Sequence, residues 1–455
     1  MTLKTALYGK VYSFRDVKDV LAKANERKSG DTLAGIGAES DLERVAAKIV
    51  LADLTVKDIT ENPVVPYEND SVTRIIMDDL NWDLYESIKG LTIGELREWL
   101  LDNKRQSDEI LTLSTALTSE VIAAVCKIMS NLDLMIVPAK LEILAHCNTT
   151  IGRRGTFSSR LQPNHPTDSV KGVTASLLEG ISYGVGDAVF GLNPAVDTVE
   201  STTDILNLFS DVKERLQIPT QICVLSHITT QMKALQNHVP MDLCFQSIAG
   251  SEASLASFGV TTEMLAEANA MMAELSTAEG PNYMYFETGQ GSELSSSGHN
   301  GADQQTMESR CYGLARHYKP FLVNTVVGFI GPEYIYDTKE LIRAALEDNF
   351  CGHMHGLPMG CDICYTNHMK ADQNDVDSLL VMLASSGCHY IMGVPEGDDI
   401  MLMYQSTGYH DIAAVREMLG KRPIKEFEEW LEAHGIMENG RLTDLAGDPT
   451  RLMVK

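Results

Sequence analysis

The part of the chain after about residue 145 contains six polar residues whose types and positions match a binding site for a small polar molecule. They are Arg160, Gln162, Asn193, Gln246, Glu287 and Asp362, and each stands in or at the end of a short apolar segment. Arg160 and Gln162 are two residues apart, so in a strand their side chains point to the same face. Two carboxylates suit an ammonium group, and a guanidinium with amides can hold a hydroxyl or a developing oxyanion. A small amino alcohol therefore fits this set, but the set alone does not choose a reaction.

Each of these residues also has a purely structural interpretation. A single Gln or Asn at the end of a strand commonly binds loop backbone, and Arg160 could be a structural ion-pair partner of Glu287 or Asp362. His227 ends another apolar segment, where it is either a buried, hydrogen-bonded histidine or a ligand. The convergence of many polar groups favours a binding site, since their desolvation is unfavourable without a polar ligand. Two alternatives stay open: a metal-dependent aldolase or hydrolase with Glu287, Asp362 and His227 as ligands, and a scaffold without catalysis.

Cysteine and histidine spacings raise the question of a metal site. Cys361, Cys364 and His368 resemble part of a zinc site, but no second CxxC or HxxxH stands at finger spacing. The two cysteines also fall inside an apparent strand, where adjacent side chains alternate between faces. His353 and His355 are two residues apart, and we expect them in a solvated loop rather than on a metal. We therefore predict no metal site.

The elements that must position these residues alternate regularly after about residue 145. Short apolar segments alternate with longer helical patterns, which indicates a parallel sheet. Eight such units favour closure into a (β/α)8 TIM barrel, an α/β fold in which active sites lie at the carboxyl ends of the strands. An open doubly wound sheet is the alternative, but it would commonly carry a glycine-rich fingerprint, and no GxGxxG or Walker motif is present. The expected strands are 156–162, 187–193, 221–227, 243–250, 283–291, 322–331, 358–366 and 389–395.

The chain divides into three parts: an N-terminal helical region (1–145), the catalytic barrel (146–420), and a short C-terminal extension of one helix and a polar tail (421–455). In the first part we expect a helix that ends before Gly30 and a second helix capped by Asp41. Thr92 and Glu95 have the spacing of a capping box, and 102–109 is polar enough to be a loop. We see no chemistry in this region.

Composition excludes several classes of function. A net charge of -26 argues against a protein that binds nucleic acid or an anionic membrane surface, while it suits a cationic substrate or simply solubility. Nine scattered cysteines, an odd number, are typical of reduced, mostly buried thiols in a cytosolic protein. We find no signal peptide and no run of eighteen apolar residues, so we expect no membrane segment.

Several long segments closely resemble one enzyme family, the large subunits of ethanolamine ammonia-lyase. They are TTIGRRGTFSSRLQPN, GVGDAVFGLNP, FETGQGSELS, GLARHYKPFLVNTVVGFIGPEY, MGCDICYTNH and YIMGVPEGDDIMLMYQST, and the likeness runs to about residue 450. The resemblance implies the barrel and a carbon–nitrogen lyase that converts ethanolamine to acetaldehyde and ammonia by radical chemistry with adenosylcobalamin. It also implies a light (small) subunit as partner in a higher hetero-oligomer, in the cytoplasm and, in many family members, inside a bacterial microcompartment.

The resemblance further assigns residues to roles. Substrate would be bound by Arg160, Gln162, Asn193, Glu287 and Asp362, of which Glu287, Arg160 and Asp362 are the catalytic set. Glu287 would bridge the two ends of the substrate, with Gln162 and Asp362 on the ammonium and Arg160 and Asn193 on the hydroxyl oxygen. Cobalamin would contact Pro194, Gln246, Ser295 and Met401. No DxHxxG motif and no spare flavodoxin-like domain are present, so we expect the cofactor to keep its own lower ligand and its nucleotide tail to lie partly in the light subunit.

Overall fold

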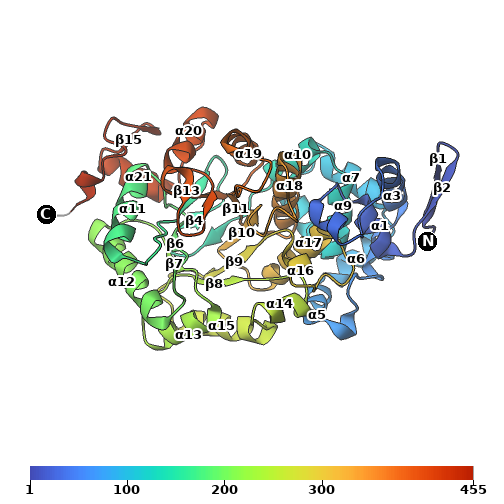
Figure 1. Ribbon diagram of the computed structural model, residues 1–455, viewed down its shortest axis with the longest axis horizontal. Helices are drawn as coiled ribbons and strands as arrows, with labels where there is room; N and C mark the ends of the chain where they lie inside the picture. Colours follow the sequence, from blue (N-terminus) through green and yellow to red (C-terminus); the bar gives the residue numbers. More distant parts are fainter. Residues whose placement is uncertain (454–455) are drawn as a thin grey trace.

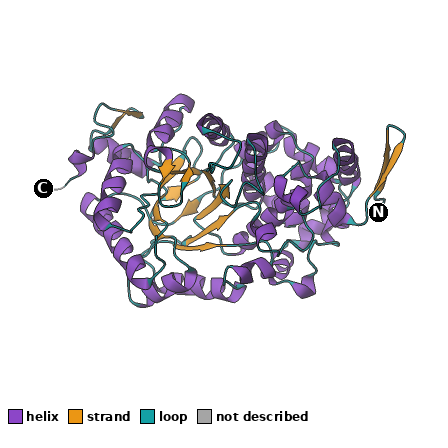
Figure 2. Cartoon of the chain, in the orientation of Figure 1, coloured by secondary structure: helices purple, strands orange, loops and turns teal. Residues whose placement is uncertain are grey.

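A parallel eight-stranded sheet forms the centre of the molecule in a computed structural model that describes residues 1–453. Helices surround the strands on all sides in the cartoon (Figure 2). The strand order is β7-β6-β5-β12-β11-β10-β9-β8, and the backbone N–H of Leu243 donates to the Ile222 carbonyl at 3.2 Å across the two ends of this order. The predicted TIM barrel is confirmed. Its strands are β5 (Ser158–Leu161), β6 (Val189–Leu192), β7 (Ile222–Val224), β8 (Cys244–Ser247), β9 (Met284–Thr288), β10 (Leu322–Val327), β11 (Met359–Ile363) and β12 (Tyr390–Gly393).

All eight expected strands are present, each shorter than its apolar segment. The helices that follow them cover the outside of the barrel (Figure 1). The helices are α11 (Val170–Ser182), α12 (Val199–Leu216), α13 (Ile228–Gln236), α14 (Glu252–Ser257), α15 (Thr262–Leu275), α16 (Ser292–Ser295), α17 (Gln304–His317), α18 (Thr338–Met354), α19 (Gln373–Ser385), α20 (Tyr409–Leu419) and α21 (Lys425–Ala433).

The first 140 residues are mainly helical and lie together beside the barrel (Figure 1). The capping box of Thr92 and Glu95 is present at the start of α7. The helices are α1 (Val17–Ala24), α2 (Ser29–Leu33), α3 (Asp41–Asp53), α4 (Val56–Thr60), α5 (Ser71–Asp78), α6 (Trp82–Ile88), α7 (Ile93–Leu101), α8 (Ser107–Ser114), α9 (Ser119–Lys127) and α10 (Asn131–Lys140), with a 3-10 turn, η1 (Tyr67–Asn69).

The expected helix before Gly30 is present as α1, which ends at Ala24, and a second helix, α2, starts at Ser29 and contains Gly30. Two other local predictions in this region are wrong. Ser40, rather than Asp41, caps α3, since its side chain accepts the N–H of Glu43. The predicted loop at 102–109 is cut short, because α8 already begins at residue 107.

Short hairpins complete the chain, and none of them was predicted. The first, β1 (Lys4–Leu7) with β2 (Lys10–Ser13), extends away from the body at the N-terminal end of the molecule (Figure 1). The expected polar tail contains another hairpin and a 3-10 turn, η3 (Pro449–Leu452), whose Leu452 is buried. The remaining short pieces are β3 (Ala145–His146), β4 (Thr150–Ile151), η2 (Pro395–Gly397), β13 (Asp398–Asp399), β14 (Tyr404–Gln405), β15 (Met437–Glu438) and β16 (Arg441–Leu442).

Buried ion pairs join the N-terminal helices to the barrel. Lys28 lies 2.7 Å from Glu347 of α18, and Lys127 of α9 lies 2.7 Å from Asp303, which caps α17. All four side chains are fully buried. A buried charge is stable only with its partner in place, so these pairs fix how the two regions pack.

The cysteines and two histidines test the remaining sequence predictions. All nine cysteines are buried and free, as predicted for reduced thiols. The expected solvated loop at His353 and His355 is wrong: both lie at the carboxyl end of α18 and are buried, and each ring bonds a backbone carbonyl of the preceding turn. Within residues 1–453, no helix combines the length and the apolar character needed to cross a bilayer.

Candidate active site

A small cavity of about 50 Å³ opens at the carboxyl ends of the barrel strands. It is large enough for a few heavy atoms, since a single water needs only about 10–15 Å³ on the same measure. Five of the six residues chosen from the sequence line it together. The lining residues are Arg160, Gln162, Asn193, Glu287, Val326, Phe329, Asp362, Leu402 and Tyr404.

Arg160 makes the largest number of hydrogen bonds among the polar residues that line the cavity. It stands in β5 with only 1% of its surface exposed, and Gly191 of β6 leaves room for it, because a Cβ there would lie 3.1 Å from its Nε. Its Nη1 donates to the Tyr285 hydroxyl at 2.6 Å, and its Nη2 donates to Asn193 Oδ1 at 2.9 Å. Burial lowers the pKa of this guanidinium, but nearby Tyr285 and the carboxylates raise it above its usual value, so it stays charged.

Glu287 is the carboxylate most open to a ligand. Its Oε1 accepts a bond from Arg160 Nη1 at 3.1 Å and another from Asn324 Nδ2 at 2.9 Å. Its side chain is 14% exposed, whereas that of Arg160 is 1% exposed. The strand β9 presents Tyr285 and Glu287 to the barrel interior together, because they are two residues apart. Glu287 Oε2 is therefore free to meet a ligand from the open side.

Asp362 is buried deeper, in β11. It accepts hydrogen bonds from the Tyr404 hydroxyl and the Ser406 Oγ, both at 2.8 Å. Burial raises the pKa of this carboxyl to about 7, although Tyr404 and the charge of Arg160 act in the opposite direction. Asp362 is thus poised to change its charge near neutral pH.

Gln162 connects the cavity to the segment after the last barrel strand. Its Oε1 accepts from Arg160 Nη2, and its Nε2 donates to Asp399 Oδ2 at 2.7 Å and to the Tyr404 hydroxyl at 3.2 Å. Because a carboxylate can only accept, Asp399 sets which end of the amide faces Arg160.

Several polar residues of this network were missed in the sequence, among them Tyr285, Asn324, Asp399, Tyr404 and Ser406. The two-residue spacing of Tyr285 to Glu287 was a usable signal for the first. The others carried no such signal, since Asp399 and Tyr404 belong to a hairpin that only the fold brings back over the barrel.

The chain also has close relatives of known activity. A family model described as "Ethanolamine ammonia lyase large subunit" matches residues 12–445. The ethanolamine ammonia-lyase large subunits of Escherichia coli (strain K12) and Salmonella typhimurium (strain LT2) are each 56% identical to the chain over 450 residues, covering 99% of both sequences. The chain belongs to the ethanolamine ammonia-lyase large subunit family.

Two strand-end residues of this ethanolamine ammonia-lyase family member lie outside the cavity lining. His227 caps α13, with Nδ1 2.8 Å from Thr229 Oγ1 and Nε2 3.2 Å from the Phe258 carbonyl. Gln246 is buried, accepting the Ile228 N–H at 2.9 Å and donating to the Ser247 carbonyl at 3.0 Å. Both therefore have the structural contacts that were the alternative interpretation. Among residues 1–453, Glu287, Asp362 and His227 do not form a group of metal ligands, which weighs against the metal-dependent alternative.

Apolar side chains form an exposed rim around the cavity. Phe329 is 40% exposed, Val196 58%, Ile400 62% and Met403 78%, and they follow three different barrel strands. Two of the residues that the family resemblance assigns to cobalamin, Pro194 and Met401, stand in the same loops and are half-buried, whereas Ser295 follows β9 and is exposed at the end of α16. Single exposed apolar residues are common, but a cluster around a polar cavity is typical of a binding face.

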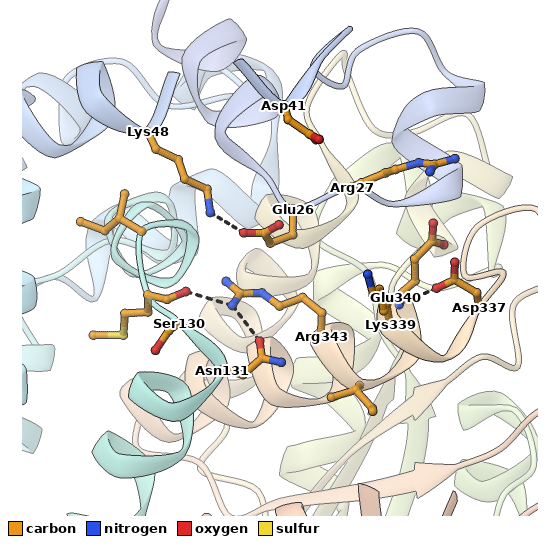
Figure 3. A pocket seen from close by; sticks show the side chains of 13 residues that line it. Glu26, Arg27, Asp41, Lys48, Ser130, Asn131, Asp337, Lys339, Glu340 and Arg343 are labelled. Atoms are coloured by element: carbon orange, nitrogen blue, oxygen red, sulfur yellow. Dashed lines mark hydrogen bonds and ion pairs between the residues drawn. The ribbon is translucent and has the colours of Figure 1, made fainter. Parts of the chain in front are cut away.

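A much larger cavity, about 720 Å³, lies away from the strand ends (Figure 3). It lies between the link that joins α1 to α2 on one side and the starts of α10 and α18 on the other. Some of its polar groups are paired: Lys48 forms an ion pair with Glu26, and Arg343 donates to the Met129 carbonyl at 2.9 Å and to Asn131 at 3.1 Å.

Proposed function

We propose that this chain is the catalytic subunit of an adenosylcobalamin-dependent ethanolamine ammonia-lyase, which converts ethanolamine to acetaldehyde and ammonia. The observation that carries the proposal is the cavity itself, which places Glu287 and Asp362 around the buried guanidinium of Arg160. An ammonium group needs a carboxylate, and a hydroxyl oxygen a few ångströms away needs a hydrogen-bond donor. This arrangement supplies both. The name of the relatives supports the same substrate.

We infer the following orientation for the substrate. The ammonium group lies against Asp362, Glu287 and the remaining lone pair of Gln162 Oε1. The hydroxyl oxygen accepts from Asn193 Nδ2, which makes no hydrogen bond to the protein among the described residues. Arg160 uses its four Nη protons on Tyr285, Glu287, Gln162 and Asn193, so it reaches the substrate by exchanging one of these bonds.

The protein's part in the reaction is to hold charge in place. The positive charge of Arg160 stabilises negative charge that develops on the substrate oxygen, because a buried donor needs no reorganisation by water. Glu287 contacts both ends of the substrate and so can hold the amino group as its bond to carbon weakens. The cavity is small, so it admits few water molecules beside the reacting atoms.

The residues around the mouth fit adenosylcobalamin. The apolar rim of Val196, Phe329, Ile400 and Met403 offers a surface for the apolar face of a corrin ring. Pro194, Met401, Ser295 and the Gln246 side chain would complete the contact, the last after releasing a backbone bond. When bound, the cofactor would supply the radical that takes a hydrogen atom from the carbinol carbon.

We propose further that the enzyme works only with a light subunit, in a higher hetero-oligomer. The large-subunit name of the relatives supports a smaller partner. Within residues 1–453 the chain consists of the N-terminal helices, the barrel and a short C-terminal extension, without a flavodoxin-like domain, so we expect the nucleotide tail of the cofactor to need protein from elsewhere. Nine buried, free cysteines support a reducing compartment, the cytoplasm, with or without a bacterial microcompartment around the enzyme.

The first test is an activity assay of the reconstituted enzyme. The chain is co-expressed with a light subunit, supplied with adenosylcobalamin and ethanolamine, and assayed for acetaldehyde beside an EPR radical signal. We expect both signals only when cofactor, substrate and light subunit are present. Turnover that needs a divalent metal and ignores cobalamin would instead establish the metal-dependent alternative.

The second test removes one carboxylate. Glu287→Ala should fold normally and lose at least about 10²-fold in kcat, the scale of one preorganised electrostatic contact. Glu263→Ala, at an exposed position on α15, is the control and should keep full turnover. Near-normal kcat in the Glu287 variant, with the light subunit present, would refute the role given to this residue and support the scaffold alternative.

A further inference from the structure

Three potential metal ligands lie together in the protein interior, outside the substrate cavity. Glu293 belongs to the short helix α16 after β9, and Glu308 and Cys311 belong to α17. Their exposed fractions are 0%, 1% and 1%. One oxygen of each carboxylate and the Cys311 sulfur lie within 4.8 Å of one another, and no other such group occurs among residues 1–453.

The local sequence explains this arrangement. Glu308 and Cys311 are three residues apart on α17, so their side chains share one helix face. Metal sites between packed helices often use two ligands at this spacing with a carboxylate from a neighbouring element. Glu293 is that third ligand, and its Oε1 is held by the N–H of Gly250, at 2.7 Å, and by the Cys311 thiol, at 3.3 Å.

Each carboxylate of the group has an oxygen without a partner. Glu308 Oε1 accepts the Tyr312 hydroxyl at 2.8 Å, but Oε2 of Glu308 and Oε2 of Glu293 make no hydrogen bond. A fully buried oxygen without a partner is unfavourable by about 1–3 kcal/mol, and native proteins contain few.

The cation that acts on the group, Arg310, forms its ion pairs with other carboxylates. Arg310, on the same helix, binds Glu120 at 2.5 Å and Asp70 at 2.7 Å, and its Nε donates to the Gly250 carbonyl. Burial, followed by Asp348 and Glu293, raises the pKa of Glu308 well above its usual value. Burial likewise raises the pKa of Glu293. A positive charge placed among these groups would reverse both effects.

We propose that Glu293, Glu308 and Cys311 bind a divalent transition-metal ion of the zinc class. A thiolate favours Zn²⁺ over Ca²⁺ or Mg²⁺, which take oxygen ligands alone. Ligand atoms of a tetrahedral Zn²⁺ lie roughly 3.5 Å apart, so atoms within 4.8 Å need only small side-chain rotations. Binding releases the proton of the Cys311 thiol and any carboxyl proton to solvent, and the two free oxygens gain a partner.

The role of this metal would be structural. It would tie α16 to α17 directly behind β9, the strand that carries Glu287. The same short helix ends at Ser295, so the ion would also stiffen one side of the barrel mouth. Metal binding by these three residues requires neither substrate nor cobalamin, so it can be measured separately from the reaction.

The test measures metal in the intact chain. The protein is expressed with its light subunit in zinc-supplemented medium without cobalamin, purified, and analysed by elemental mass spectrometry and zinc-edge X-ray absorption. We expect one zinc per large chain, with a sulfur neighbour at about 2.3 Å. Zinc far below one equivalent, or zinc without a sulfur neighbour, would overturn the proposal, and this result needs no variant that must fold.

Matched variants locate the ion. Cys311→Ser and Glu308→Gln should each lower the zinc content at least tenfold, while Cys388→Ser, at another buried cysteine, should keep it. Replacing zinc by Cd²⁺ should give thiolate-to-metal ultraviolet absorption in the wild type and in Cys388→Ser only. Equal zinc and equal absorption in Cys311→Ser would show that the ion lies elsewhere and refute the assignment.

Discussion

At the scale of single residues, the site depends on one buried cation and two unequal carboxylates. Glu287 bonds directly to Arg160 and is partly exposed, whereas Asp362 is fully buried and bonded to two hydroxyls. Their environments differ, and in Asp362 burial raises the pKa of the carboxyl to about 7. Asp362 should control how substrate binding responds to pH.

We predict that KM for the cationic substrate falls as pH rises through about 7. Asp362 has a pKa of about 7 because burial outweighs its hydrogen bonds and Arg160, so only above that pH is it a carboxylate that attracts ammonium. The effect of Asp362 on folding stability runs in the opposite direction. Because its pKa is higher in the folded state than in the unfolded state, its stabilising contribution is fully present below the unfolded pKa and is lost as pH rises through 7. KM measured across the range, with folding followed separately, distinguishes the two.

Two variants check this assignment. Asp362→Asn should raise KM and remove the inflection near pH 7. Ser406→Ala removes one hydrogen bond to the charged form, so the inflection should move to higher pH. An inflection that survives unchanged in Asp362→Asn would belong to another group and contradict the prediction.

At the scale of elements, helix α18 is held to the barrel by buried histidines. His353, near the end of α18, stacks on His389, just before β12, with ring centroids 4.8 Å apart. His389 Nε2 bonds the Ile143 carbonyl at 3.0 Å. Burial lowers the pKa of His353 to about 4 and that of His389 to about 3, so the folded protein keeps both neutral.

We predict that these histidines make the fold sensitive to acid. A lowered pKa contributes stability above the unfolded value of about 6.5, and this is lost as pH falls toward the folded pKa, by up to about 1.4 kcal/mol per pH unit for each group. His389→Asn should therefore lose less stability than the wild type between pH 7 and pH 5, measured as urea unfolding midpoints. Buried acids with a raised pKa, such as Asp348, make the folded state more stable as pH falls, which opposes the effect of the histidines. The test is therefore the difference between the wild type and His389→Asn, and not the pH dependence of either protein alone. Equal losses would contradict the prediction.

At the scale of the whole molecule, the N-terminal helices and the barrel share one interior. The pairs of Lys28 with Glu347 and of Lys127 with Asp303 cross between them and are fully buried. Near residue 145 the sequence changes from helical segments to alternating strands and helices. We propose that this boundary does not separate two independently stable domains.

We predict that Lys127→Ala destabilises the whole molecule by about 3–5 kcal/mol, because it leaves Asp303 buried and unpaired. Lys57→Ala is the control: its pair with Glu61, at 3.7 Å, is exposed and should contribute no more than about 1 kcal/mol. Unfolding midpoints and limited proteolysis measure both. A Lys127 variant that unfolds like the control, or that releases a stable fragment near residue 145, would contradict this view.

The sequence alone was enough for the barrel and for most of its site. Periodicity is a local property, so eight apolar segments in alternation with helices already specify a parallel sheet, and strand ends then place Arg160, Asn193, Glu287 and Asp362 at one mouth. Errors appeared where one residue decides a helix end, as at Ser40, and where burial depends on distant packing, as at His353 and His355.

Only the tertiary structure decided which groups touch. Gln162 meets Asp399 across 237 positions of chain, Lys127 meets Asp303 across 176, and Glu293 reaches the ligand pair on α17 through a turn that no pattern marks. Polar groups of these kinds stand in the sequence without any sign of their partners. The pairing follows from closure of the barrel and packing of the N-terminal helices, which bring distant segments together and remove the water that would otherwise separate their charges.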